Sequence, residues 1–268
     1  MRRPSLARLL GSAALTALLA TGLGGCQTMG DITGALTSKA DTATETDPRR
    51  ASEVYGERYR ANPRDAEVAL RYGQALRATG QRAQATAVLE QASLAHPGNK
   101  QLLAAYGRAL ADNGNFQQAF DVLSRAHSPD NPDWRILSVQ GTALDQMGKH
   151  AEARGYYASA LRIAPDEPSV LSNLGLSYVL SRDLPKAEET LRKAQATGRA
   201  DARVRQNLAL AVGLQGRFAE AETIARADLP PDEAAANVAY LKQMLAGKIN
   251  PRTAARGRPP VVAQDPSD

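Results

Sequence analysis

Residues 66–99 read AEVALRYGQALRATGQRAQATAVLEQASLAHPGN, and this stretch of 34 residues sets the period of the whole chain. Three slots of the period hold small residues in four successive copies: Gly73, Gly107, Gly141 and Gly175; Ala85, Ala119, Ala153 and Ala187; Ala92, Ala126, Ala160 and Ala194. A fixed period of this length is typical of repeat arrays. Small residues at fixed positions indicate where two antiparallel helices approach closely. The sequence therefore predicts an all-α fold built from antiparallel helix pairs.

The composition fits such an array and argues against a nucleic-acid partner. The 268 residues are 43% hydrophobic but only 4% aromatic, which suits many small helix–helix contacts. The formal net charge of +5 falls to +2 without Arg2, Arg3 and Arg8, which belong to a segment that we expect to be removed. The remaining basic residues are scattered rather than gathered in a stripe, so we expect no nucleic-acid binding.

Five units follow the period, and their spacings resemble the tetratricopeptide repeat. They cover residues 66–99, 100–133, 134–167, 168–201 and 202–235. That repeat carries a large residue and Gly near positions 7–8, Gly at 15, Ala at 20 and 27, and Pro at 32. Unit four has Arg182 where the turn Gly is expected, and unit five lacks the first Gly. The resemblance implies a tetratricopeptide-repeat superhelical solenoid.

One helix is predicted on each side of the five units. Asp47 and Pro48 form a good N-cap and first-turn pair for a helix over 47–62. A second helix over 232–246 follows Pro230, with Val238, Leu241 and Leu245 on one apolar face. Terminal helices of this kind shield the ends of a repeat array, so the repeat domain is expected to cover residues 47–247. Residues 248–268 are basic and Pro-rich and are expected to be disordered.

The N-terminal residues look like an export signal. The arginines of residues 1–25 precede an apolar run from 9 to 20, which is the pattern of a signal peptide. The following Leu23-Gly24-Gly25-Cys26 resembles the bacterial lipoprotein box, and the resemblance implies that Cys26 is lipidated. The alternative is an ordinary secretory signal with an incidental cysteine. Cys26 is the only cysteine, so an intrachain disulfide is excluded.

The lipoprotein resemblance also implies a location. Gln27 follows Cys26, and by similarity to lipoprotein sorting this residue favours the periplasmic face of the outer membrane. Residues 26–46 are small and polar without an apolar period, which indicates a flexible tether between the lipid and the repeats.

No catalytic pattern is present, and we expect no enzyme activity, cofactor, metal or small-molecule substrate. No pair of histidines has the H-E-x-x-H spacing of a zinc site, and no Ser lies in a G-x-S-x-G elbow. His96, His127 and His150 each fall near a repeat turn and are expected to be exposed.

The tetratricopeptide resemblance implies a binding groove lined by the first helix of each unit, helix A, at positions 2, 5, 9, 12 and 13. In units one and two these positions include Glu67, Gln74, Arg77, Gln101, Arg108 and Asp112. In unit three they hold Arg135, Ser138, Thr142, Asp145 and Gln146. In units four and five they include Ser169, Ser172, Leu176, Val179, Leu180, Arg203, Gln206, Leu210 and Leu214. The groove would thus change from polar to apolar along the chain.

From this set we predict that a protein partner contacts Arg135, Thr142, Leu176, Leu180, Arg203, Gln206, Leu210 and Leu214. An apolar face of the partner would lie on the four leucines. The alternative is that these leucines are core residues covered by the 232–246 helix, and the sequence leaves both open.

A closer resemblance lies in the C-terminal part of the chain. The segments QNLAL at 206–210, GLQGRFAEA at 213–221, ADLPP at 227–231 and ANVAYL at 236–241 resemble the TadD proteins of tight-adherence (Flp) pilus systems. The resemblance implies a tetratricopeptide lipoprotein with a pilotin-like task, the assembly or localisation of the outer-membrane secretin or of another pilus component. The alternative is a general periplasmic adaptor for β-barrel assembly or for peptidoglycan enzymes.

Overall fold

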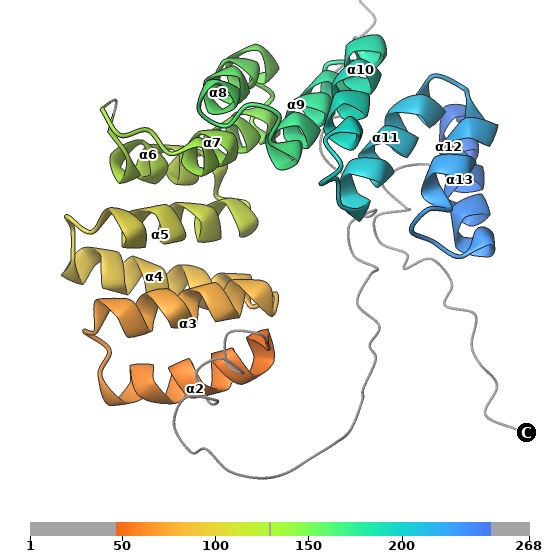
Figure 1. Ribbon diagram of the computed structural model, residues 1–268. Helices are drawn as coiled ribbons and strands as arrows, with labels where there is room; N and C mark the ends of the chain where they lie inside the picture. The colour runs from red at the N-terminus through yellow and green to blue at the C-terminus, as the bar shows by residue number, and fades with distance from the viewer. Residues whose placement is uncertain (1–46, 129, 248–268) are drawn as a thin grey trace, which may run out of the picture. The chain divides into compact units, whose positions relative to one another are not determined.

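The computed structural model describes residues 47–128 and 130–247, and these residues form α-helices and no β-strand (Figure 1). The helices are α2 (Pro48–Ala61), α3 (Ala66–Ala78), α4 (Arg82–Ala95), α5 (Lys100–Asp112), α6 (Phe116–Ala126), α7 (Trp134–Gln146), α8 (His150–Ile163), α9 (Pro168–Leu180), α10 (Leu184–Ala196), α11 (Ala202–Leu214), α12 (Phe218–Ala225) and α13 (Pro231–Leu245). The predicted all-α class is confirmed. The predictions for the signal peptide, the lipoprotein box, Cys26, the tether and the tail lie outside the described residues.

The helices belong to two compact units. The N-terminal unit, which ends at Pro165, contains α2–α8, and the C-terminal unit, which begins at Asp166, contains α9–α13. Within each unit the two helices of a repeat pack side by side, as α3 with α4 and α9 with α10 (Figure 1). Helix A of one repeat also packs against helix A of the next, as α3 against α5 and α9 against α11.

The periodic glycines make room for one large side chain in each of the first four repeats. A Cβ atom added to Gly107 would lie 2.4 Å from Cγ of Leu123 on the second helix of the same repeat. The same distance is 2.5 Å between Gly73 and Leu89 and 2.5 Å between Gly175 and Leu191. In the third repeat a Cβ on Gly141 would lie 2.6 Å from Cε1 of Tyr157. The prediction that small residues mark the close approaches is therefore confirmed.

The fifth repeat has different residues at the contact between its two helices. Ala209 occupies the glycine slot and Ala225 the slot of the large residue, and both are buried in a cluster with Ala234 of α13. One turn further along α11, a Cβ on Gly213 would lie 2.6 Å from Cδ2 of Leu241, which also belongs to α13. The large side chain that fills the glycine space thus comes from the capping helix.

The turn between the two helices of a repeat needs a left-handed residue. Gly80, Gly114 and Gly148 have φ angles of 77°, 84° and 78°, which glycine adopts without steric cost. In the fourth repeat Arg182 adopts a φ of 64° at the same position. A residue with a Cβ is strained in this region, so the fourth turn is made against the preference of its residue.

The apolar face predicted for α13 is only partly correct. Leu241 is buried and Val238 half-buried, but Leu245 is 49% exposed. Leu245 is the last residue of α13, and no further helix among the described residues follows to cover it.

Candidate functional site

The predicted partner-binding residues fall in both units. Arg135 and Thr142 lie on α7 of the N-terminal unit. The others lie in the C-terminal unit, on α9 for Leu176 and Leu180, and on α11 for Arg203, Gln206, Leu210 and Leu214.

In the C-terminal unit, the structure brings three of the four predicted leucines onto one cluster. Leu176, Leu210 and Leu214 are half-buried and pack against a buried cluster that includes Val179 and Val212. Val238 of α13 packs on the same cluster, while Leu180 is half-buried and is not among the residues of the cluster. These leucines are therefore in part core and in part surface, and the contact of their exposed parts with a partner stays a prediction.

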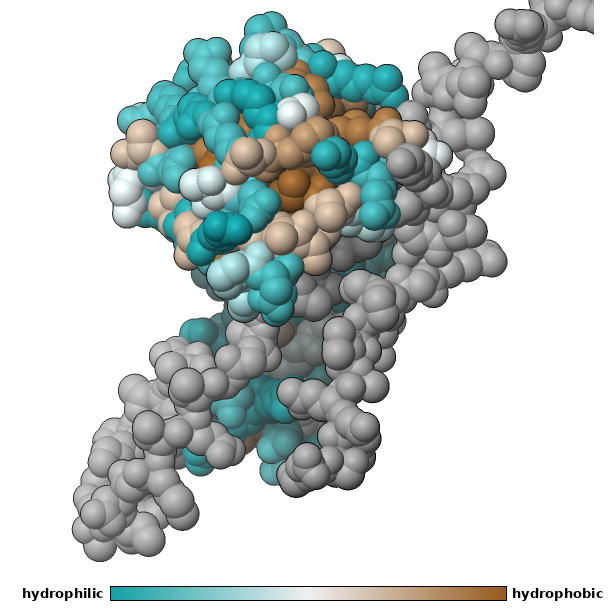
Figure 2. Space-filling view, turned by 90° about the vertical axis from the view of Figure 1, so that its right-hand side faces the viewer, coloured by the Kyte–Doolittle hydropathy of each residue, from teal (hydrophilic) through white to brown (hydrophobic). Residues whose placement is uncertain are grey.

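Hydrophobic residues also gather on a face of the C-terminal unit, with hydrophilic residues around them (Figure 2). Val179 does not contribute to such a surface, because it is only 7% exposed. The prediction that it lines the groove is wrong, since its side chain belongs to the packed interior.

Ser172 is likewise a buried residue rather than a groove residue. Its hydroxyl is fully buried and accepts a hydrogen bond of 3.0 Å from Nδ2 of Asn207 on α11. A buried hydroxyl without a partner would be costly, so this bond stabilises the contact between α9 and α11. Of the polar residues predicted for the groove on α11, Arg203 is exposed and Gln206 half-buried.

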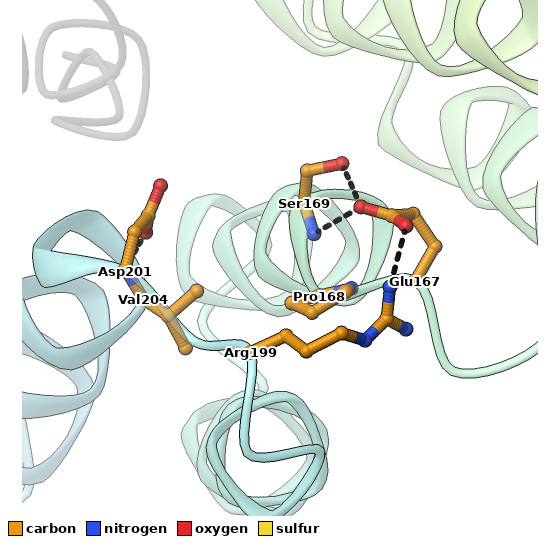
Figure 3. Close-up of a pocket in the computed structure, with 6 residues that line it drawn as sticks. All are labelled: Glu167, Pro168, Ser169, Arg199, Asp201 and Val204. Atoms are coloured by element: carbon orange, nitrogen blue, oxygen red, sulfur yellow. Dashed lines mark hydrogen bonds and ion pairs between the residues drawn. The ribbon is translucent and has the colours of Figure 1, made fainter.

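A cavity of about 120 Å³ lies at the junction of the fourth and fifth repeats (Figure 3). It is lined by Glu167, Pro168, Ser169, Arg199, Asp201 and Val204. Glu167 caps α9 and accepts a hydrogen bond of 2.9 Å from the Ser169 hydroxyl, and Nη1 of Arg199 lies 3.6 Å from its carboxylate. Asp201 caps α11. The polar groups of this cavity hold the two repeats together, so we assign it a structural role.

In the N-terminal unit, Asp145 is the centre of a buried hydrogen-bond network. Its carboxylate accepts a bond of 2.9 Å from the Tyr157 hydroxyl, and its other oxygen lies 2.8 Å from Nδ1 of His150. Burial, and after it the charge of Asp145, raises the pKa of Tyr157, so this phenol stays protonated and acts as a donor. Asp145 and Ser138, both 6% exposed, were predicted on the groove surface, and this prediction is wrong because both are buried.

The prediction that the histidines are exposed is also wrong. All three are half-buried, because each repeat turn packs onto a neighbouring segment. Nε2 of His96 lies 2.8 Å from the carbonyl oxygen of Arg64, and Nε2 of His127 lies 3.3 Å from the side-chain oxygen of Gln140. These contacts explain the histidines as structural groups.

The predicted residues of α7 differ in their surroundings. The Thr142 hydroxyl is half-buried and donates to the carbonyl of Ser138 at 3.1 Å, so its hydrogen-bonding capacity is partly used. Arg135 is exposed, and its guanidinium lies 4.4 Å from the centre of the Trp134 ring. Only the arginine keeps its donors available for a partner.

Arg135 belongs to a group of charged residues from three adjacent A helices. Arg77 of α3 donates to Asp112 of α5 at 2.6 Å, and Arg108 of α5 is half-buried near both. Burial lowers the pKa of Arg108; the negative charges of Asp133 and Asp112 raise it, and the positive charges of Arg77 and Arg135 lower it. Arg108 was placed on the groove surface by the repeat pattern but was not among the selected contact residues.

The described part of the chain contains neither a metal-binding cluster nor a membrane-spanning helix. No cluster of three or more His, Cys, Asp or Glu residues there has the arrangement of a metal site. No helix between residues 47 and 247 has the length and apolar character needed to span a membrane.

Comparison with known proteins identifies the repeats. A family model described as "Tetratricopeptide repeat" matches residues 43–109 and 146–211. No curated protein matches the sequence.

Solved structures share the fold. A chain of the APC/C hetero-tetramer Cut9-Hcn1 superposes with a TM-score of 0.62 at 16% identity, over 78% of this chain and 41% of that one. The present chain thus spans about two fifths of the length of that relative. MamA gives a TM-score of 0.49 at 22% identity, over 62% of this chain and 95% of MamA. YrrB, described as a TPR protein with an unusual peptide-binding site, gives 0.47 at 14%, over 71% of this chain and all of YrrB.

Proposed function

Because the chain is a tetratricopeptide-repeat protein, we propose that it is a lipid-anchored scaffold that binds a protein partner and assists assembly of the secretin of a Flp pilus. The repeats suggest a protein-interaction scaffold. The lipid anchor and the role in secretin assembly are proposed in addition to this. The scaffold works by equilibrium binding, in which the lipid raises the local concentration of the repeats near membrane partners.

The observation that carries the scaffold is the state of the leucines on α9 and α11. Leu176, Leu210 and Leu214 are held by one buried cluster, yet each keeps part of its side chain accessible. Half-exposed apolar side chains on a rigid surface are suited to the apolar face of a partner helix. Arg203 is exposed on α11 and supplies a charged group on the same helix.

The lipoprotein box supports the anchor and the location. Leu23, Gly24 and Gly25 precede Cys26 as in the bacterial box, and Gln27 favours the outer membrane. Attached acyl chains contribute about 0.8 kcal/mol for each buried CH₂ group, so more than one chain gives stable anchoring.

The resemblance to the TadD proteins supports the choice of partner. Its four segments fall on α11, α12 and α13 and on the residues between them. Two of the half-exposed leucines, Leu210 and Leu214, lie in those segments. This part of the chain is therefore where we place the contact with the secretin.

The test is the amount of heat-resistant secretin multimer in outer-membrane fractions. Three strains are compared, with the wild-type protein, without it, and with Cys26→Ser. We expect the multimers to be lost in the deletion strain and to be reduced or displaced from the outer membrane with Cys26→Ser. Immunoblots of the variant in whole cells provide the control for its abundance.

Normal multimers in all three strains would contradict the role in secretin assembly and would favour the general periplasmic adaptor. Loss in the deletion strain together with normal multimers for Cys26→Ser would retain the assembly role and exclude the need for the lipid.

A further inference from the structure

α13 has the position of a first helix of a repeat whose second helix is not among the described residues. It packs against α11 and α12 as α5 packs against α3 and α4. Its inward-facing residues repeat the spacing of three core residues of α11. These are Ala234, Val238 and Leu241 on α13, and Val204, Leu208 and Ala211 on α11, each pair 30 positions apart. The same shift places Ala239 in the slot of Ala209, which is the glycine slot of the repeats. Ala209 is buried, whereas Ala239 is exposed, because no second helix in the described part of the chain covers it.

α2 is the reverse case, a second helix without a first among the described residues. It packs against α3 as α4 packs against α5. Ala51 and Tyr55 precede Ala85 and Leu89 by one period of 34 residues, so Tyr55 stands in the slot of the large side chain that fills the glycine space. Tyr55 is half-buried and is not among the residues of the core cluster against which Tyr59 of the same helix packs. α2 thus presents the large residue of a repeat, and α13 presents the small one.

The charges at the ends of these two helices are complementary as well. The first turn of α13 contains Asp232 and Glu233, and the last turn of α2 contains Arg58 and Arg60, all of them exposed. The two helices of a repeat form an antiparallel hairpin, so the start of the first helix lies beside the end of the second. A repeat formed from α13 and α2 would therefore bring opposite charges together.

The fourth repeat shows this arrangement of charges within one chain. Nζ of Lys193, in the last turn of α10, lies 2.9 Å from a carboxylate oxygen of Asp166. Nη1 of Arg199, which follows α10, lies 3.6 Å from the carboxylate of Glu167, the N-cap of α9. A basic end of the second helix beside an acidic start of the first is thus a contact that this chain already contains.

We propose that α2 of one copy of this chain docks on α13 of a second copy, so that the two incomplete units form one complete repeat. Tyr55 would then lie over Ala239, as Leu89 lies over Gly73 within the first repeat. The contact joins two different surfaces, so each pair of copies leaves one α2 and one α13 available for further copies. The inference goes beyond the scaffold function above, since it concerns the ends of the array and a partner identical to the chain itself.

The charged residues lie on the same helix faces as the two side chains that would meet. Arg58 follows Tyr55 by three residues, and its guanidinium lies 5.5 Å from the centre of the Tyr55 ring. Asp232 precedes Ala239 by seven residues, which is about two turns and returns to the same face. In an antiparallel pair, Arg58 and Asp232 therefore lie toward the same end of the contact.

The test is disulfide trapping between two variants, because a contact of one helix pair is smaller than most stable interfaces and is expected to be weak. Tyr55→Cys and Ala239→Cys are prepared as separate full-length chains in non-ionic detergent and are mixed with oxidised glutathione. Ala158→Cys, at an exposed alanine of α8, replaces Ala239→Cys in the control mixture, and the wild type reports any reaction of Cys26. We expect disulfide-linked dimers to form about 10-fold faster in the first mixture, because docking raises the effective concentration of the two thiols.

Equal rates in the two mixtures would overturn the proposal. Fast dimer formation by either variant alone would show that like helices meet, and would overturn the head-to-tail order. Fast trapping only after removal of residues 248–268 would show that the chain's own C-terminal residues cover α13, and would overturn the proposal for the full chain.

A charge reversal gives a second readout. Arg58→Asp, added to the Tyr55→Cys variant, should slow trapping about fivefold, and Asp232→Arg, added to the Ala239→Cys variant, should restore the rate. A rate that stays low in the doubly reversed pair would overturn the proposed alignment of the two helices. If circular dichroism shows that Tyr55→Cys loses helix, Arg58→Cys takes its place in the trapping experiment, since Arg58 is exposed and lies on the same face.

Discussion

The second and fifth repeats use different pairs of residues where their two helices pack together. In the second repeat Gly107 faces Leu123, so that one partner has no side chain and the other has a large one. In the fifth repeat both partners are alanine, Ala209 and Ala225. The Gly–Leu pair thus supplies four side-chain carbons at the crossing and the Ala–Ala pair only two, while the helices pack as a pair in both repeats.

The comparison shows what each solution requires. In the second repeat, the space over Gly107 is occupied by Leu123 of the same repeat. The Ala–Ala pair is completed from outside, because Ala234 joins its cluster and Leu241 occupies the space at Gly213. The fifth repeat therefore depends on α13, and three substitutions test this difference.

The largest effect is expected for Gly107→Ala. The added methyl group would overlap the Leu123 side chain at Cγ and would lie 3.4 Å from the carbonyl oxygen of Ala119, so the two helices must separate. We expect a loss of about 3 kcal/mol in the free energy of unfolding, measured by urea denaturation followed by circular dichroism.

The double variant Gly107→Ala with Leu123→Ala recreates the pair found in the fifth repeat. Leu123→Ala alone should also cost about 3 kcal/mol, because it leaves a cavity. We expect the double variant to be clearly more stable than the sum of the two losses predicts. Simple additivity would show that the two residues do not share one space.

A smaller effect is expected for Leu241→Ala in α13. Its side chain is buried over Gly213, and its truncation should cost about 2 kcal/mol and reduce the hydrogen-exchange protection of α11 and α12. Leu245→Ala in the same helix is the control, since that side chain is 49% exposed and its loss should change stability by less than about 0.5 kcal/mol. Equal effects would contradict the dependence of the fifth repeat on Leu241.

The smallest effect concerns the turns and has the opposite sign. Arg182→Gly should stabilise the C-terminal unit by about 1 kcal/mol, because glycine adopts the φ of 64° without strain. Gly114→Arg is the reciprocal change in the second repeat and should cost about the same amount. The midpoint of urea unfolding measures both, and a destabilised Arg182→Gly variant would show that the arginine side chain contributes more than the strain costs.

The periodic part of the fold could be predicted from the sequence because it depends on residue size. Gly73, Gly107, Gly141 and Gly175 recur at one interval, and their effect on helix packing is the same in every repeat. The replacement of this pair in the fifth repeat was visible as a missing glycine. The compensation by Leu241 was not visible, because it comes from a helix outside the period.

The partners of polar side chains could not be predicted in the same way. Helical spacing places Asp112 on the face of Arg108, but it does not decide that Asp112 binds Arg77 from another repeat instead. Asp145 was expected on the groove surface from its position in the repeat, and the large Tyr157 that packs against Gly141 brings its hydroxyl to this carboxylate. Which partner a polar side chain bonds depends on all the groups that lie near it in the folded structure, and a repeat pattern does not give these neighbours.

The bonds between successive A helices also bear on how the chain acquires its structure. The hydrogen bonds from Arg77 to Asp112 and from Asn207 to Ser172 each join residues 35 positions apart, about one repeat along the chain. Chains whose contacts are local in sequence lose little entropy on loop closure and fold rapidly. In a repeat array, structure can start in one copy and spread to its neighbours. A repeat can therefore complete its packing as soon as the next one is available, so the protein can fold progressively, one repeat after another.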